Sequence, residues 1–144
     1  MASRLLSDCH PDLQLAYVKF VSGMKNANID FIVTCTYRGD DEQNALYSQG
    51  RTAPGNIVTC AKAGQSAHNI TREDGSPLSC AFDIVIMDNG KCVWSATDPR
   101  WEVAGHIGLS CGLQWGGDWR AFREYPHFEL PNWQSIKSQF QLGV

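Results

Sequence analysis

The chain has 144 residues, of which 43% are hydrophobic and 19% are charged. A chain of this length can bury enough surface to fold without disulfides or a partner, and its composition excludes the disordered and collagen-like classes. Twelve basic and fifteen acidic residues give a net charge of −3, which argues against a protein that binds nucleic-acid phosphates. No apolar run approaches the roughly 20 residues of a membrane span, so we expect no membrane insertion.

The cysteines and the N-terminal residues bear on the compartment. The start of the chain, MASRLLSDCH, contains no apolar signal core, so we expect no signal peptide. The six cysteines, at positions 9, 35, 60, 80, 92 and 111, form no C-x-x-C pair. Reduced thiols are therefore expected rather than a disulfide framework. No repeat or low-complexity tract divides the sequence, which predicts one domain over residues 1–144.

The first half of the chain predicts two helices around one strand. A helix begins at Pro11, because apolar residues from Leu13 to Met24 follow helical spacing. The β-branched run 29–36 predicts a strand. Asp40-x-x-Gln43 resembles a capping box that starts a short helix, which Gly50 closes. Residues 51–80 show little periodicity, and long irregular stretches of this kind are usually functional or mobile.

The second half predicts short strands and two more helices. Residues 82–87 form a strand, and Asp88-Asn89-Gly90-Lys91 is a hairpin turn into residues 92–94. Asp98-Pro99 starts a helix that stops at Gly112. A short strand over 127–130 precedes a last amphipathic helix near residues 133–140. The pattern indicates an α+β fold with a small antiparallel sheet and flanking helices.

Three residues suggest a metal site. His10 and His106 are expected to be ordinary surface histidines, whereas His68 lies in the irregular region and His127 just ahead of a strand. Asp83 lies within the apolar run AFDIVI, where an unpaired carboxylate would cost several kcal/mol to bury. It either faces solvent, pairs with an arginine such as Arg38 or Arg100, or binds a cation. Two histidines and one carboxylate make a three-ligand set for catalytic zinc.

Glu124 is the candidate general base. Hydrolysis at zinc needs a group that accepts the proton of the attacking water and returns it to the leaving amine. Glu124 precedes His127 by three residues, and Pro126 disfavours a helix between them. We therefore expect a turn or bulge that brings Glu124 beside the metal ligand. The alternative is a surface glutamate before a proline turn.

Several motifs together resemble one enzyme family. The runs YRGDDEQNALYSQGRTAPGNIVT, GQSAHN, AFD, LQWGGDW and PHF are similar, in order, to phage endolysins of the zinc D-alanyl-D-alanine carboxypeptidase superfamily. The most similar members are L-alanyl-D-glutamate endopeptidases, which cut the stem peptide of bacterial peptidoglycan. The resemblance implies the zinc peptidase fold of that superfamily.

The resemblance also implies roles for individual residues. In the family pattern S-x-H…A-x-D…H, the zinc ligands correspond to His68, Asp83 and His127, and the general base to Glu124. Arg38 corresponds to the arginine that stabilises the substrate or its oxyanion, a task that suits a permanently charged, forked donor. Ser66 is expected to orient the loop or a ligand. Three aromatic side chains either line the cleft or belong to the core, namely Trp115, Trp119 and Phe128.

The sequence departs from the family pattern in two places. Residues 69–80 separate the first histidine from the aspartate by more than is usual, and this insertion predicts an added polar hairpin or flap. Loop length costs little entropy, so the ligands can still converge. The base is Glu where many of these endolysins have Asp, and both residues can accept a proton.

The leading hypothesis is a zinc endopeptidase that lyses the host of a phage. The expected enzyme is a monomer without a separate cell-wall-binding domain. It would remain in the host cytoplasm until a separate pore-forming holin admits it to the periplasm and the cell wall. The alternatives are a D-alanyl-D-alanine carboxypeptidase or dipeptidase, a non-catalytic zinc-stabilised binding module, and a structural protein with incidental histidines.

Overall fold

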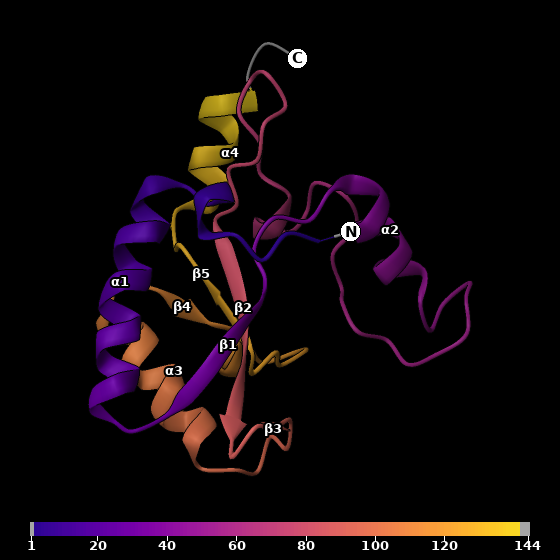
Figure 1. Ribbon diagram of the computed structural model, residues 1–144. Helices are drawn as coiled ribbons and strands as arrows, with labels where there is room; N and C mark the ends of the chain where they lie inside the picture. The colour runs from indigo at the N-terminus through magenta and orange to yellow at the C-terminus, as the bar shows by residue number, and fades with distance from the viewer. Residues whose placement is uncertain (1, 142–144) are drawn as a thin grey trace.

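Antiparallel strands form one sheet at the centre of the structure, a computed structural model that describes residues 2–141 (Figure 1). The strand order is β1 (Asp30–Cys35), β2 (Ala81–Asp88), β5 (His127–Glu129) and β4 (Gln114–Trp115). β3 (Lys91–Val93) pairs with the second half of β2, beyond the part that pairs with β5. β2 is therefore the central strand, and its first half lies between β1 and β5.

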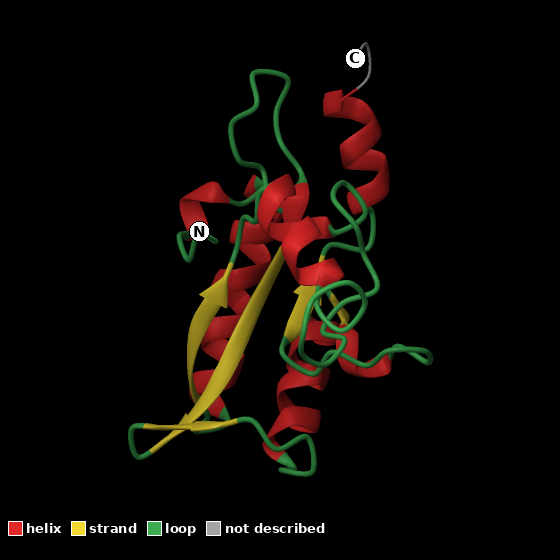
Figure 2. Cartoon of the chain, turned by 90° about the vertical axis from the view of Figure 1, so that its right-hand side faces the viewer, coloured by secondary structure: helices red, strands yellow, loops and turns green. Residues whose placement is uncertain are grey.

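Helices cover both sides of this sheet. α1 (Pro11–Asn26) and α3 (Arg100–Ser110) contact each other on one side, and α2 (Asp40–Ser48) lies on the other (Figures 1 and 2). α4 (Trp133–Gln141) follows the last strand. Three 3-10 turns complete the described elements, at Leu6–Asp8, Ala67–Asn69 and Gly116–Asp118. The prediction of a small antiparallel sheet with flanking helices is confirmed.

The core lies between α1, α3 and the sheet. The rings of Phe82 and Phe128, which are paired across β2 and β5, stack with their centroids 5.5 Å apart. Phe20 of α1 packs 4.9 Å from Phe128. α3 approaches the sheet so closely that a Cβ on Gly105 would lie 2.3 Å from the ring of Trp115. Trp115 and Phe128 thus belong to the core, which leaves the opposite face of the sheet free for a site.

The boundaries of the long elements agree with the sequence pattern, but the capping of α2 does not. Gly39 is the N-cap of α2, and no side chain caps the helix. The predicted capping box is therefore wrong. Gln43 is fully buried, and its amide donates to the carbonyl of Ala61 at 2.7 Å. Its side chain is therefore bonded beneath α2 and does not cap the start of the helix.

The insertion forms a small hairpin. Thr71 and Pro77 pair as an antiparallel bridge, and the tip between them is largely exposed. Ile70, Leu78 and Cys80 anchor its base in the core. All six cysteines are free thiols. None of the described helices is both long and apolar enough to span a bilayer.

Candidate active site

One row of the sheet carries the centre of the site. Asp83 of β2 is paired with Cys35 of β1 on one side and with His127 of β5 on the other. Residues paired across antiparallel strands project to the same face of a sheet. An irregularity in β1 between Val33 and Cys35 brings Cys35 into this row. Three chemically reactive side chains therefore lie side by side on the face opposite α1.

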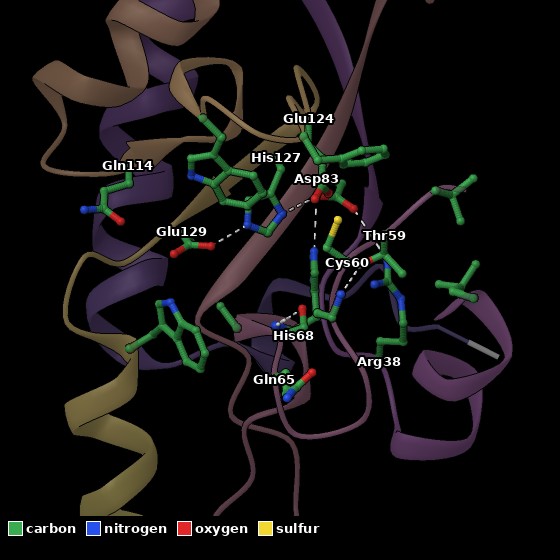
Figure 3. A pocket seen from close by; sticks show the side chains of 18 of the residues that line it. Arg38, Thr59, Cys60, Gln65, His68, Asp83, Gln114, Glu124, His127 and Glu129 are labelled. Atoms are coloured by element: carbon green, nitrogen blue, oxygen red, sulfur yellow. Dashed lines mark hydrogen bonds and ion pairs between the residues drawn. The ribbon is translucent and has the colours of Figure 1, made fainter. Parts of the chain in front are cut away.

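His68 reaches this row from a 3-10 turn. Ser66 caps the turn and accepts from the backbone N–H of His68 at 3.2 Å, and Asn69 completes a capping box. The His68 ring is 2% exposed. Its Nδ1 lies 2.6 Å from the carbonyl oxygen of Thr36, and its Nε2 lies 3.1 Å from Oδ1 of Asp83 (Figure 3). Because a carbonyl only accepts, Nδ1 carries the proton and Nε2 faces Asp83.

His127 is held in the same manner with its nitrogens reversed. Its Nε2 lies 2.7 Å from Oε1 of Glu129, and its Nδ1 lies 3.0 Å from Oδ1 of Asp83. Glu129 is two residues further along β5, so both side chains occupy one face. A carboxylate that accepts from one nitrogen of a histidine leaves the other nitrogen free to bind a metal. Both histidines thus direct one nitrogen at the same oxygen of Asp83.

This arrangement requires positive charge. Burial alone would lower the pKa of His68 and of His127, but the charge and hydrogen bonds of Asp83 outweigh it and raise these pKa values to about 10 and about 9. Burial would raise the pKa of Asp83, whereas the two histidines hold it well below its usual range. Two ring nitrogens facing a carboxylate need either protons or a cation between them. A divalent cation such as zinc fits this donor set.

Glu124 lies beside the cluster on a tight turn. The N–H of His127 donates to the carbonyl of Glu124 at 3.2 Å, and the N–H of Glu124 donates to the carbonyl of Gly116 at 3.0 Å. A Cβ on Gly116 would lie 2.3 Å from the Glu124 carbonyl oxygen, so the turn requires glycine there. Burial, aided by the charge of Asp83, raises the pKa of Glu124, although the neighbouring cations oppose the shift. The expected turn is present, and Glu124 lines the cleft.

Arg38 approaches Asp83 from the other side. Its Nη2 lies 3.6 Å from Oδ2 of Asp83, and its Nη1 donates to Oε1 of Gln43 at 2.9 Å. Asn69 donates to the backbone carbonyl of Arg38, also at 2.9 Å. The guanidinium is therefore fixed by buried amides rather than free to rotate. Of the two arginines considered for Asp83, Arg38 is the neighbour, and Arg100 pairs instead with Asp98 and Asp88.

Cys35 supplies a further possible ligand. Among the described residues, Cys35, His68 and Asp83 offer ligand-type atoms that all lie within 4.8 Å of one another. The thiol, however, lies 3.7 Å from Nδ1 of His68, the nitrogen already bonded to Thr36, and it accepts from Arg38 at 3.4 Å. His127 instead presents a free nitrogen directly to Asp83. The local bonding therefore favours His127 over Cys35 as the third ligand.

The cluster lies where two pockets meet. The larger has a volume of about 840 Å³ and the smaller about 330 Å³. Asp83, Glu124 and His127 line both, together with Val58 and Phe122. The 70–80 hairpin contributes no residue to the described lining of either pocket, so of the two forms predicted for the insertion the structure has the hairpin and not a flap. Trp119 lines the larger pocket, and its ring lies 5.0 Å from that of His127.

The sequence interpretation missed three members of the site. Glu129 could have been found from its i, i+2 relation to His127 on a strand. Cys35 lies near the end of the predicted strand 29–36 and has no distinguishing pattern. Gln43 was assigned to a helix cap. The five residues predicted to act as ligands, base and cation are brought together by the structure, and Ser66 shapes the turn that carries one of them.

Comparisons with known proteins place this site in a family. Residues 59–130 match a family model described as D-alanyl-D-alanine carboxypeptidase. The chain is also 37% identical over 135 residues to the peptidoglycan L-alanyl-D-glutamate endopeptidase CwlK of Bacillus subtilis, covering 88% of this chain and 76% of that protein. The chain belongs to this peptidase family. The matched region contains His68, Asp83, Glu124 and His127, so the cluster is the candidate active site of a peptidase.

The fold of this peptidase has a counterpart in a solved structure. The crystal structure of the Serratia marcescens L-Ala D-Glu endopeptidase ChiX superposes with a TM-score of 0.56, over 94% of this chain and 92% of that one. The sequence identity is 19%, so this likeness concerns the fold. The prediction of an enzyme, a metallopeptidase that hydrolyses peptidoglycan, is confirmed by the family match and by the 37% identical relative.

Proposed function

We propose that this peptidase is a zinc-dependent peptidoglycan endopeptidase that cleaves the L-alanyl-D-glutamate bond of the stem peptide. The observation that carries the proposal is the convergence of two histidine nitrogens on one oxygen of Asp83, with Glu124 beside them in an open cleft. The name and 37% identity of the Bacillus relative support the choice of substrate.

His68, Asp83 and His127 would hold the zinc, through Nε2, a carboxylate oxygen and Nδ1 respectively. Zinc bound by three protein ligands keeps a fourth position open, lowers the pKa of a water placed there and polarises a carbonyl. Thr36 and Glu129 fix the ring orientations by accepting from the opposite nitrogens. Both rings are therefore held so that one nitrogen of each points at Asp83.

Glu124 and Arg38 would perform the remaining chemistry. Glu124 accepts the proton of the attacking water and returns it to the amine of the departing D-glutamate, a task for which a raised pKa is an advantage. Arg38, held by Gln43, offers a fixed positive charge to the oxyanion that develops on the scissile carbonyl. Both side chains line the larger pocket beside the proposed ligands.

The shape of the cleft favours an endopeptidase over a carboxypeptidase. A carboxypeptidase removes a terminal residue and needs little space beyond the scissile bond on that side. Here, two pockets share the walls that Asp83, Glu124 and His127 form, so space extends from the cluster into each of them. A chain that extends past the scissile bond in both directions therefore fits the site.

The test has two readouts, namely the new amino termini that appear in digested peptidoglycan and the zinc content of the protein. Purified protein should release D-glutamate amino termini from peptidoglycan, and Glu124→Gln should abolish this release while one equivalent of zinc stays bound. Glu73→Gln, on the exposed tip of the hairpin, is the matched control and should behave as wild type. Release of D-alanine instead would support the carboxypeptidase, and full activity of Glu124→Gln would refute the assigned base.

We also propose that this peptidase lyses the bacterial host of a phage. This role rests on the resemblance of the sequence motifs to phage endolysins, as does dependence on a holin for passage from the cytoplasm. Expression inside a bacterium with and without a pore-forming protein tests it. Lysis only when both proteins are present supports the role, and lysis by the peptidase alone contradicts the need for a holin.

A further inference from the structure

The smaller pocket differs in character from the larger one. Its own walls, apart from the shared residues, are mainly apolar or aromatic and include Ile57, Trp94 and Pro126, with Arg123 as the one charged residue among those described. The Trp94 side chain is 59% exposed and Ile57 is 45% exposed. Large apolar side chains that remain open to water beside a reactive centre are typical of a binding surface. The smaller pocket is therefore suited to an occupant with an apolar face.

The larger pocket is polar by comparison. Beyond the catalytic cluster its walls include Gln65, Gln114, Arg120 and Gln134. These side chains offer amide donors and acceptors and a cation. They suit an occupant that carries carboxylates and amide groups. The cleft thus has one apolar arm and one polar arm, joined at Asp83, Glu124 and His127.

The substrate assigned under the proposed function has the same asymmetry about its scissile bond. On the carbonyl side a single L-alanine is joined through a lactyl group to an N-acetylated sugar ring, which has no ionised group because its carboxyl forms the amide. On the amine side follow D-glutamate and the rest of the peptide, with free carboxylates. Only one small residue separates the sugar from the reacting carbonyl. A pocket that begins at the catalytic cluster is therefore within reach of the sugar.

We propose that the smaller pocket is a subsite for the N-acetylmuramyl ring, and that the exposed indole of Trp94 stacks against the C–H face of this sugar. The proposal rests on the proposed function. The volume of about 330 Å³ lies within the range of small-ligand sites. Trp101 also lines the pocket, and its buried indole N–H has no hydrogen-bond partner within residues 2–141.

A sugar subsite makes the enzyme selective for stems that are still attached to glycan. The test measures kcat/KM for L-Ala–D-Glu cleavage in a disaccharide-tetrapeptide and in the same tetrapeptide without sugar. Wild type should prefer the glycan-linked substrate. Trp94→Ala should reduce that preference about tenfold, which is the size expected for loss of one aromatic contact and its buried area. Trp94→Phe, which keeps a ring face, should restore most of it.

Leu15→Ala removes an equally exposed apolar side chain from α1, outside both pockets, and is the matched control. It should leave the ratio of the two kcat/KM values unchanged. Equal cleavage of both substrates by wild type overturns the proposal. So does a Trp94→Ala variant that slows both substrates by the same factor, since that indicates a structural role. Failure of the proposed function gives a different result, because wild type then cleaves neither substrate at this bond, and the subsite falls with it.

Discussion

Removing the charge of Glu129 tests whether this carboxylate tunes the proposed metal centre. Its Oε1 lies 2.7 Å from Nε2 of His127, and the two side chains are only 9% and 4% exposed. The hydrogen bond is therefore short, charge-assisted and shielded from water. Glu129→Gln keeps an acceptor of the same shape but loses the charge that makes His127 a stronger ligand.

Loss of a carboxylate partner behind a metal-binding histidine typically costs 10–100-fold in metal affinity, which is about 1.4–2.7 kcal/mol. We expect Glu129→Gln near the lower limit and Glu129→Ala near the upper one, because alanine also removes the acceptor that orients the ring. Competition with a chromogenic zinc chelator measures both. Glu73→Gln serves as the surface control. Zinc affinity in Glu129→Ala equal to that of wild type would refute the role assigned to this pair.

Three further predictions follow from the geometry. The acid limb of the kcat/KM profile should lie at higher pH than an exposed glutamate would give, because the base works deprotonated and burial raises the pKa of Glu124; a limb at or below that of a free glutamate contradicts this assignment. Arg38→Ala should lower kcat about 100-fold. It should also move the acid limb of the kcat/KM profile to still higher pH, because the charge of Arg38 lowers the pKa of Glu124 and its removal lets that pKa rise. A change in KM alone would indicate that Arg38 only binds substrate. Gly105→Ala should cost about 1–3 kcal/mol in urea unfolding, because its Cβ would lie 2.3 Å from Trp115, and unchanged stability would show that the ring can move.

The long elements could be predicted from the sequence because their signals are local. Pro11 with helical apolar spacing begins α1, and the turn after β2 has left-handed residues where Asn89 and Gly90 permit them, at φ of 50° and 78°. The capping of α2 could not be predicted, because tertiary contacts hold Gln43 beneath the helix. β4 is only two residues long and depends on pairing with β5, a contact that no local pattern reveals.

Some residues of the candidate site could likewise be recognised from the sequence, and others only from the fold. His68, Asp83 and His127 were conspicuous because each is a polar group of ligand type in an unexpected context, and the family motif ordered them. Cys35 could not be recognised from the sequence, because only an irregularity in β1 places it opposite Asp83. The separation of the cleft into a polar and an apolar arm depends on Trp94, which the sequence places at the end of a short strand with nothing to mark it as part of a site. Such features arise only when distant segments pack together.

The identity of the metal ligands is tested most directly by zinc analysis of four proteins, namely wild type, His68→Ala, His127→Ala and Cys35→Ala. Circular dichroism should first show that each variant is folded. We predict one equivalent of zinc in wild type and in Cys35→Ala, and loss of zinc in both histidine variants. Retention of zinc in His127→Ala together with its loss in Cys35→Ala would contradict the proposed ligand set and would assign the centre to the thiol.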